Sequence, residues 1–205
     1  DAIIISATKG IDIISFQTMS QLLSTQLQNS GLTNKIGVLS GPNLAKEIAG
    51  KHLTASVIAS SNTSVFHAAT TCLRSDFFRL YSNTDVLGVE LCGALKNIYA
   101  IAAGLMDALD MGDNSKSMFL TRSLAEMSRF CVPLGADPMT FLGLAGIGDL
   151  MATCASSLSR NYSVGYSLGK GLNLNEILAQ MNQVAEGVNT LAAVHKQAQL
   201  SNIAM

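Results

Sequence analysis

One apolar stretch, residues 89–104, constrains the fold more than any other part of the chain. It reads VELCGALKNIYAIAAG, with good helix formers throughout and no proline, and it therefore predicts a helix. Apolar or small residues cover almost every face, so this helix must be buried on most sides. Lys96 lies in its middle, and none of the residues three or four positions away is an acid. An ammonium in such surroundings must lower its pKa, extend to solvent or meet an acid from elsewhere in the fold.

Considered alone, Lys96 is better explained as a lysine that extends to the surface than as a functional residue. Its surroundings favour the functional interpretation. Asn97 adds a neighbouring polar group, and the small residues Gly93, Ala100 and Gly104 allow another backbone or a ligand to approach the helix closely.

Before this helix, strand-like and helix-like segments alternate along the chain. The first, residues 2–5, is a mostly β-branched apolar run, which is the pattern of a strand buried on both faces of a parallel sheet. Alternation of this kind is typical of an α/β layer. Strands are expected at residues 2–5, 35–39, 53–60 and 78–81, and helices at about 12–27, 44–48 and 64–74.

After residue 84 the strand pattern stops and only helical patterns follow. We therefore expect part of an α/β domain at residues 1–84 and an all-α domain at residues 85–205. The chain enters a strand directly after Asp1 and stops at Met205 without a terminating signal, so we expect both ends to be cut from something longer. Helices are expected at about 87–110, 115–131, 138–143, 147–156, 160–169, 174–181 and 187–200.

Composition excludes several classes of function. Hydrophobic residues make up 48% of the chain and charged residues 13%, which indicates a compact globular protein. A net charge of -1 gives no reason to expect nucleic acid or an anionic membrane as a partner. The four cysteines form no CxxC pair, which favours reduced thiols in a cytoplasmic compartment. The longest apolar run, residues 98–106, is too short to span a bilayer, and the three histidines lack the spacing of a metal site.

Two loops that follow strands carry residues suited to ligand binding. Lys9 follows the first expected strand and Gly41 the second, and ligands of open α/β sheets bind beyond the carboxyl ends of the strands. Gly41 precedes Asn43 and a helix start, where free backbone N–H groups suit an anion or a dinucleotide. A solvated loop lysine and an ordinary strand-to-helix turn are the alternatives.

Two further motifs lie among the expected helices. Asp149 follows Gly-Ile-Gly and opens a helix, with Thr153 one turn later on the same face. Asp149 either caps that helix or supplies the acid that Lys96 lacks locally. The segment 159–161, Ser-Arg-Asn, begins another helix; an arginine there opposes the helix dipole, whereas phosphate binding would use it. Glu186 precedes the last helix and fits an ordinary first-turn acid equally well.

Taken together, these motifs resemble the NAD(P)-dependent glycerol-3-phosphate dehydrogenases of the bacterial type. The motifs occur in the family's order and extend over nearly the whole chain. They are SATKGI at 6–11, SGPNLAKEIA at 40–49, VELCGALKNIYAIAAG at 89–104, GLAGIGDLMATC at 143–154, SRNYSVG at 159–165 and VAEGVNT at 184–190.

The resemblance implies a fold, an activity and a set of site residues. Residues 1–84 would be the later part of a Rossmann-type NAD(P)-binding domain with a parallel sheet, and residues 85–205 an all-helical substrate and dimerisation domain. The implied activity is interconversion of sn-glycerol 3-phosphate and dihydroxyacetone phosphate with NAD or NADP, in a cytoplasmic homodimer that supplies phospholipid synthesis. Lys96 would be the general acid/base, with Asp149 as its catalytic partner. The implied substrate-binding residues are Lys9, Gly41, Asn43, Lys96, Asn97, Asp149, Thr153, Ser159, Arg160 and Asn161, and the implied cofactor-binding residues are Lys9, Ala45, Arg160, Val184 and Glu186.

Two departures from the family pattern leave alternatives open. Asn43 stands where the family usually carries serine or threonine, and the glycine-rich dinucleotide loop, which the family places before SATKG, is not in this sequence. A related dehydrogenase of the same architecture, acting on another hydroxy acid or sugar acid, is one alternative. A non-catalytic fragment that binds a substrate or a partner is the other.

Overall fold

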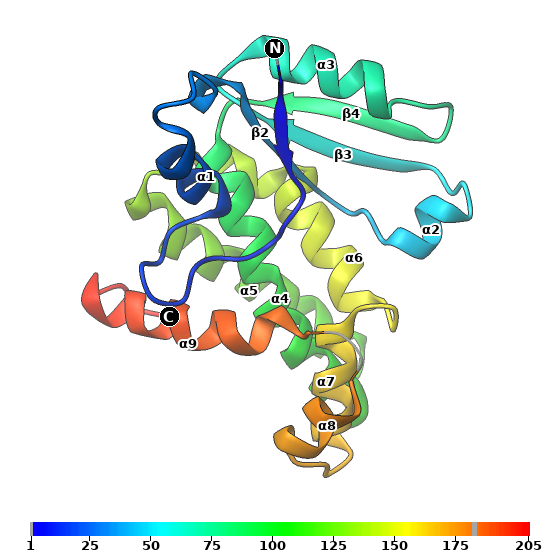
Figure 1. Ribbon diagram of the computed structural model, residues 1–205. Helices are drawn as coiled ribbons and strands as arrows, with labels where there is room; N and C mark the ends of the chain where they lie inside the picture. Colours follow the sequence, from blue (N-terminus) through cyan, green and yellow to red (C-terminus); the bar gives the residue numbers. More distant parts are fainter. Residues whose placement is uncertain (1, 182–183) are drawn as a thin grey trace.

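The computed structural model describes residues 2–181 and 184–205 and contains a four-stranded sheet followed by a group of helices. Figure 1 shows the sheet at one end of the molecule and the helices that follow it below. Helix α3 covers one face of the sheet, and the amino-terminal part of α4 packs on the other. The strands are β1 (Ile4–Ser6), β2 (Ile36–Ser40), β3 (Thr54–Ala59) and β4 (Phe78–Asn83).

The sheet is mostly parallel, as expected, and its strand order is β1-β2-β3-β4. β1 pairs with β2 in parallel, and so does β3 with β4, but β2 and β3 run antiparallel. A parallel connection needs a long crossover, usually a helix that spans the sheet. Between β2 and β3 the only helix is α2 (Ala45–Ala49), five residues long, so the chain returns in the opposite direction.

The expected helix at about 12–27 begins seven residues later than predicted, because α1 covers Met19–Leu27. Asp12 accepts hydrogen bonds from the backbone N–H groups of Ile14 and Ser15. Such local bonds compete with helix formation and here produce a turn instead. The helix then starts after Thr18, whose N–H donates to the Gln21 side chain at 2.9 Å.

The remaining helices agree closely with their predicted positions, with one exception. Residues 138–142 form a 3₁₀ helix, and residues 144–148 form a π-helical turn before α6 begins. Gly146 permits this turn, because an added Cβ would lie 2.2 Å from the carbonyl oxygen of Phe141. The α-helices are α3 (Thr63–Leu73), α4 (Val86–Ala108), α5 (Asp113–Cys131), α6 (Asp149–Ala155), α7 (Arg160–Gly169), α8 (Leu174–Gln180) and α9 (Glu186–Leu200).

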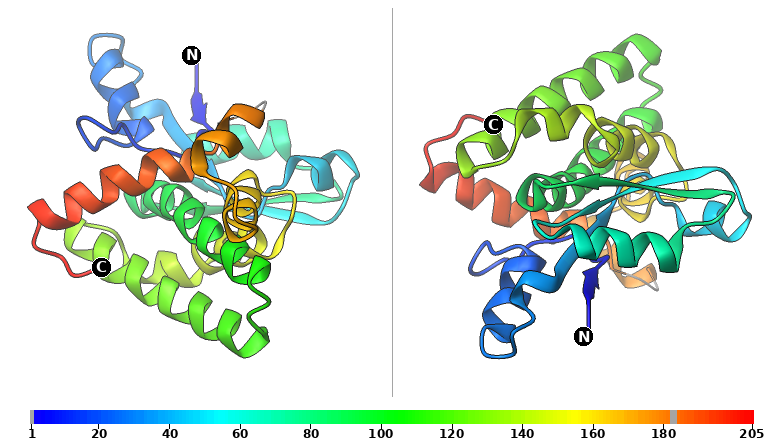
Figure 2. Two further views of the ribbon diagram at one scale, coloured as in Figure 1. Left: turned by 90° about the horizontal axis from the view of Figure 1, so that it is seen from below. Right: turned by 90° about the horizontal axis from the view of Figure 1, so that it is seen from above.

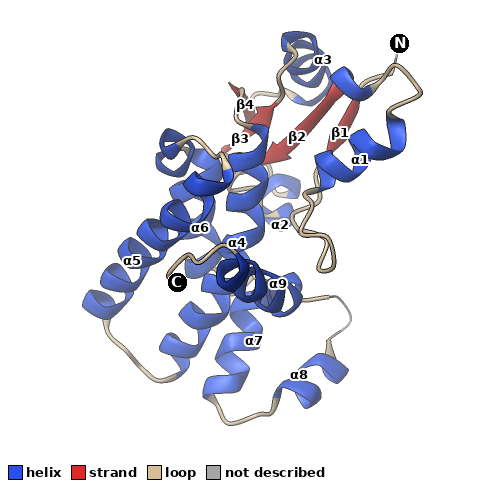
Figure 3. Cartoon of the chain, turned by 90° about the vertical axis from the view of Figure 1, so that its left-hand side faces the viewer, coloured by secondary structure: helices blue, strands red, loops and turns tan. Residues whose placement is uncertain are grey.

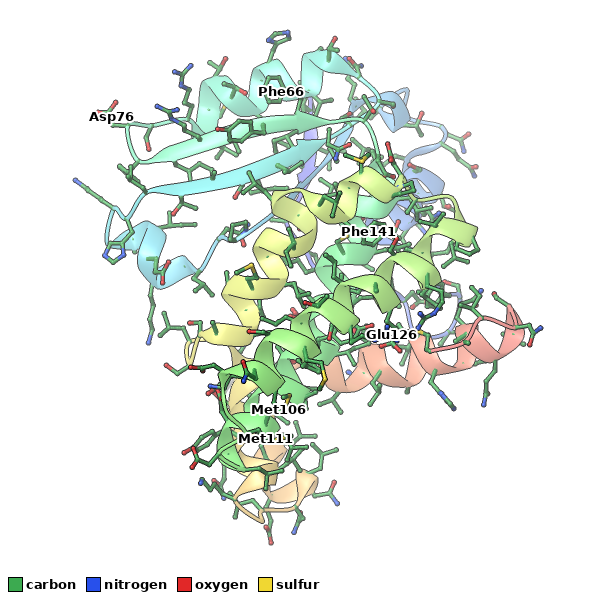
Figure 4. The ribbon with its side chains drawn as sticks, turned by 180° about the vertical axis from the view of Figure 1, so that it is seen from behind. Phe66, Asp76, Met106, Met111, Glu126 and Phe141 are labelled. Carbon is green, nitrogen blue, oxygen red and sulfur yellow. The ribbon has the colours of Figure 1, made fainter. Side chains whose placement is uncertain are left out.

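Helix α4, predicted as the buried helix, is the centre of the molecule. Figures 2 and 3 show α5, α6, α7 and α9 arranged around it. It is long and apolar enough to cross a membrane, but 72% of its most apolar window is buried inside the protein, which is typical of a core helix. The side chains that pack around it include Phe141, labelled in Figure 4.

Glycines bring α4 and α7 into backbone contact. A Cβ added to Gly165 of α7 would lie 1.7 Å from the carbonyl oxygen of Ile101, and one added to Gly104 of α4 would lie 2.0 Å from that of Tyr162. We predicted that small residues of this helix allow another backbone to approach it. At Gly104 the backbone of α7 does so. This close contact holds α7, and the site residues at its start, against α4.

Candidate active site

Two lysines from distant parts of the chain share one buried carboxylate. The Lys9 ammonium lies 2.7 Å from Asp149 Oδ2, and the Lys96 ammonium lies 2.5 Å from Asp149 Oδ1. Asp149 is the first residue of α6, one position after its N-cap Gly148, and is 1% exposed. It therefore acts as the acid that Lys96 lacks within its own helix, and not as a helix cap.

The loop after β1 places Lys9 at the carboxyl edge of the sheet. Besides Asp149, the Lys9 ammonium donates to the carbonyl oxygen of Gly41 and to Asn43 Oδ1, each at 2.9 Å. Lys9 reaches this position along Gly93 of α4, because an added Cβ there would lie 3.3 Å from Lys9 Cγ. The two loops that follow β1 and β2 thus meet at one point, as the sequence predicted.

Lys96 is buried and strongly perturbed. Its ammonium also donates to Thr153 Oγ1 at 2.7 Å, one turn of α6 beyond Asp149. Burial lowers the pKa of Lys96 from its ordinary value of 10.5 to about 8, the negative charge of Asp149 opposes that shift, and the positive charge of Lys9 adds to it. A lysine with a pKa near 8 exchanges protons readily at neutral to mildly alkaline pH.

A cavity of about 490 Å³ lies next to this cluster. Residues of α2 line it on the sheet side, and the first residues of α7 and α9 line it on the helical side. Most of the residues singled out from the sequence face it, with α4 and α6 supplying the residues between these walls. The cavity is lined by Lys9, Asn43, Leu44, Ala45, Lys46, Lys96, Asn97, Thr153, Leu158, Ser159, Arg160, Asn161 and Glu186.

A second polar group lies where α9 begins. Glu186 Oε2 accepts from Asn97 Nδ2 at 3.3 Å, and Glu186 Oε1 lies 3.8 Å from the Arg160 guanidinium. Asn161 Oδ1 accepts from the N–H of Gly187 at 2.9 Å. Asn161 therefore holds the start of α9 against α7.

Ser159 has a structural contact as well as a place in the cavity wall. It is the N-cap of α7, and its hydroxyl accepts from the N–H of Tyr162 at 3.3 Å. The motif at residues 159–161 predicted that Ser159, Arg160 and Asn161 bind an anion together. They do line one wall together, next to the start of α7.

Three predicted residues do not line the cavity. One of them, Asp149, contacts the lining residues Lys9 and Lys96. Val184 is 65% exposed, and Gly41 contributes through its carbonyl contact with Lys9. Conversely, three lining residues were not predicted: Leu44, Lys46 and Leu158. Lys46 directly follows the predicted Ala45, so the helix start that drew attention to Ala45 was the available signal.

The arrangement combines a proton-exchanging amine with a cationic wall. Lys96 can take or release a proton at the cavity floor, and Arg160, with the polar side chains beside it, can hold an anion at the wall. These are the requirements for acid/base chemistry on a small anionic molecule.

Comparison with known proteins identifies the family. The model of the NAD-dependent glycerol-3-phosphate dehydrogenase C-terminus matches residues 85–205, and the corresponding N-terminus model matches residues 1–66. The chain belongs to the NAD-dependent glycerol-3-phosphate dehydrogenase family. The resemblance inferred from the motifs is thereby confirmed.

Individual glycerol-3-phosphate dehydrogenases agree with this assignment in sequence. The chain is 54% identical over 196 residues to a glycerol-3-phosphate dehydrogenase [NAD(P)+] of Pseudomonas syringae pv. syringae, covering 96% of this chain and 56% of the relative. It is 54% identical over 205 residues to that of Saccharophagus degradans, covering 100% of this chain and 56% of the relative. The chain thus spans a little over half the length of these curated relatives.

Solved structures of glycerol-3-phosphate dehydrogenases share the fold. The crystal structure from Coxiella burnetii superimposes with a TM-score of 0.88 at 38% identity, covering 100% of this chain and 62% of that one. The enzyme of Dunaliella salina gives a TM-score of 0.86 at 29% identity, covering 97% of this chain and 35% of that one. The partial sheet followed by helices is therefore the fold of this family.

Proposed function

We propose that these residues form the catalytic centre of an NAD(P)-dependent glycerol-3-phosphate dehydrogenase, which interconverts sn-glycerol 3-phosphate and dihydroxyacetone phosphate. The observation that carries the proposal is that Lys96, which lines a cationic cavity, contacts the buried carboxylate of Asp149. Family membership supports the reaction class.

Lys96 is the proposed proton-transfer residue. An alcohol has a pKa far above neutrality, so its oxidation needs a base, and the neutral Lys96 amine can take the hydroxyl proton. In the opposite direction the Lys96 ammonium donates that proton and stabilises negative charge developing on the carbonyl oxygen. Asp149 and Thr153 fix the amine in place, since both accept from it.

The substrate phosphate is proposed to bind at the start of α7. Arg160 offers a planar, permanently charged guanidinium, and Ser159 and Asn161 line the same wall. A phosphate monoester carries about two negative charges at neutral pH, which suits this cationic surface. Asn97 and Lys9 lie between this wall and the proton-transfer group and are proposed to contact the substrate, as is Asn43 beside Lys9.

The cavity also fits one end of the dinucleotide cofactor. Its cationic lining suits the nicotinamide half, with its phosphate. Ala45, Arg160, Glu186 and Lys9 would hold that half there, with Val184 at the edge. NAD or NADP, when bound, supplies or accepts the hydride.

Two alternatives were raised by the sequence. A related dehydrogenase for another hydroxy acid would not require a phosphate on its substrate, so activity on a substrate lacking phosphate separates it from this proposal. The non-catalytic alternative drew on the glycine-rich loop outside this sequence. The buried, perturbed Lys96 argues against it, because burying two ammonium groups around one carboxylate is costly to a fold that does not use them.

The test is Lys96→Ala in a protein of the relatives' full length that contains this sequence, hereafter the full-length protein. Reduction of dihydroxyacetone phosphate by NADH or NADPH should be lost, while cofactor binding, followed by the change in NADH or NADPH fluorescence, stays intact. Lys196→Ala, at an exposed position of α9, is the matched control and should retain wild-type turnover. Near-normal turnover by Lys96→Ala would refute the proposal.

We further propose that the full-length protein is a cytoplasmic homodimer that supplies glycerol phosphate for phospholipid synthesis. This rests on the family resemblance, together with reduced thiols: the four cysteines are all free. Sedimentation equilibrium of the full-length protein tests the dimer, and a monomer at micromolar concentration would contradict it.

A further inference from the structure

Lys46 enters the cavity from the side opposite Arg160. It is the second residue of α2, directly after the loop that holds Gly41 and Asn43, and its side chain forms part of the cavity wall. Arg160 is the first residue of α7. Figure 1 shows α2 beside the sheet and α7 among the helices, and Lys46 and Arg160 line the same cavity from these two elements.

Lys46 differs from the other cations of the cavity in its electrostatic surroundings. Lys9 and Lys96 both contact Asp149, and Arg160 faces Glu186 at 3.8 Å. For the Lys46 ammonium, by contrast, no ion pair or hydrogen bond is formed with residues 2–181 or 184–205. Its charge therefore remains available to a ligand.

The lining as a whole carries excess positive charge. Four cations, Lys9, Lys46, Lys96 and Arg160, and one acid, Glu186, line the cavity. Asp149, below the floor, offsets one more charge. The net charge of this group is then two positive charges, and without Lys46 it would be one positive charge. A phosphate monoester carries about two negative charges, so the lining balances such a group only when Lys46 contributes.

A solvated lysine on a short helix is the ordinary explanation for an exposed residue such as Lys46. Two observations favour binding: the side chain faces a cavity shared with three other cations, and the ligands proposed for that cavity carry phosphate groups. A lysine binds phosphate as a flexible point charge, which suits a residue at the rim.

We propose that Lys46 binds a phosphate group of a ligand in this cavity, opposite Arg160, and thereby determines specificity for phosphorylated ligands. The proposal rests on the function proposed above and adds a residue to it. The phosphate belongs either to the three-carbon substrate or to the dinucleotide. The chemistry is the same in both cases, and the test separates the two sources.

The test compares Lys46→Gln, Lys46→Arg and the control Lys196→Gln in the full-length protein. Loss of one charged contact should raise one Michaelis constant roughly five- to tenfold in Lys46→Gln, with kcat little changed. A rise for dihydroxyacetone phosphate assigns the substrate phosphate, and a rise for NADH or NADPH assigns the cofactor. Lys46→Arg should restore most of the affinity, and the defect should shrink as salt screens the charge.

Binding of inorganic phosphate, measured by isothermal titration calorimetry, provides a readout independent of turnover. Lys46→Gln should bind inorganic phosphate several-fold more weakly than the wild type when the substrate phosphate is the ligand. Unchanged Michaelis constants in Lys46→Gln would overturn the proposal, and so would an equal change in the control Lys196→Gln. Turnover by the wild type would still uphold the proposed function in either case. If the wild type does not reduce dihydroxyacetone phosphate, the proposed function fails, and equal phosphate binding by wild type and Lys46→Gln then overturns this inference too.

Discussion

Lys96 Nζ lies 2.5 Å from Asp149 Oδ1, although 53 residues separate the two in sequence. Both side chains are almost completely buried, at 8% and 2% exposure. The pair joins the central helix α4 to the start of α6.

The first prediction concerns pH dependence. With a pKa of about 8, Lys96 is mostly an ammonium at pH 7 and mostly an amine at pH 9. Oxidation of glycerol 3-phosphate, which needs the amine, should therefore rise with pH through about 8, and reduction of dihydroxyacetone phosphate should fall over the same range. Initial rates of the full-length protein in both directions measure this.

The variant Thr153→Val sharpens the pH prediction. Thr153 accepts a hydrogen bond from the Lys96 ammonium, so its loss disfavours the charged form and lowers the pKa. Both pH profiles should move to lower pH. Thr121→Val, on the exposed face of α5, should leave the profiles unchanged. A shift to higher pH in Thr153→Val would show that Lys96 is not the titrating group.

The second prediction concerns stability. Asp149→Asn removes the one carboxylate between two ammonium groups and should lower the free energy of unfolding by about 3 kcal/mol at pH 7, as expected when one partner of a buried pair is lost. Asp76→Asn is the control, since Asp76 is exposed at the far side of the sheet (Figure 4). Urea denaturation of the full-length proteins measures both.

The pH dependence of this defect provides a second check. Because the folded-state pKa of Lys96 lies below its ordinary value of 10.5, the unfolded chain holds more protons between about pH 8 and 10.5, and the contribution of Lys96 to stability rises with pH there. Without Asp149 the amine loses its proton at a lower pH than in the wild type, so the defect should shrink as the pH rises toward about 8 and stay constant above that. A defect of equal size at pH 7 and pH 9 would argue against an ionic cause.

The third prediction concerns the contact between α4 and α7. Gly165→Ala would place Cβ 1.7 Å from the carbonyl oxygen of Ile101, so the two helices must separate. We expect a loss of about 3 kcal/mol in unfolding free energy. Gly10→Ala, where no atom lies within 4 Å of an added Cβ, should leave the urea midpoint nearly unchanged. A tolerated Gly165→Ala would mean that α7 is not held by this contact.

Much of the fold was predictable because local patterns decide it. The apolar run around Lys96 required a buried helix, and α4 is that helix. The turn at residues 12–17 was missed because the N–H and hydroxyl of Ser15 donate to Asp12 Oδ2, and these hydrogen bonds override an otherwise helical pattern. The antiparallel pairing of β2 with β3 was missed because periodicity specifies a strand but not its direction.

The site was predictable in its residues but not in its contacts. Spacing within one helix showed that Lys96 had no local acid, and Asp149 was a candidate partner. That Lys9 shares the same carboxylate depends on how the loop after β1 packs on Gly93, which is a tertiary property. Lys46 was missed because the helix start at Ala45 indicated a site there but did not show that the next residue also lines the cavity.

The contacts of Lys9 have a consequence for ligand binding. An ammonium has three N–H donors, and Gly41, Asn43 and Asp149 accept one hydrogen bond each. A ligand oxygen can therefore accept from Lys9 only by displacing one of these partners, of which the uncharged Asn43 amide is the weakest competitor. Docking at Lys9 is then an exchange of one acceptor for another. Such an exchange contributes little net affinity, but it couples arrival of the ligand to movement of the loop that follows β2.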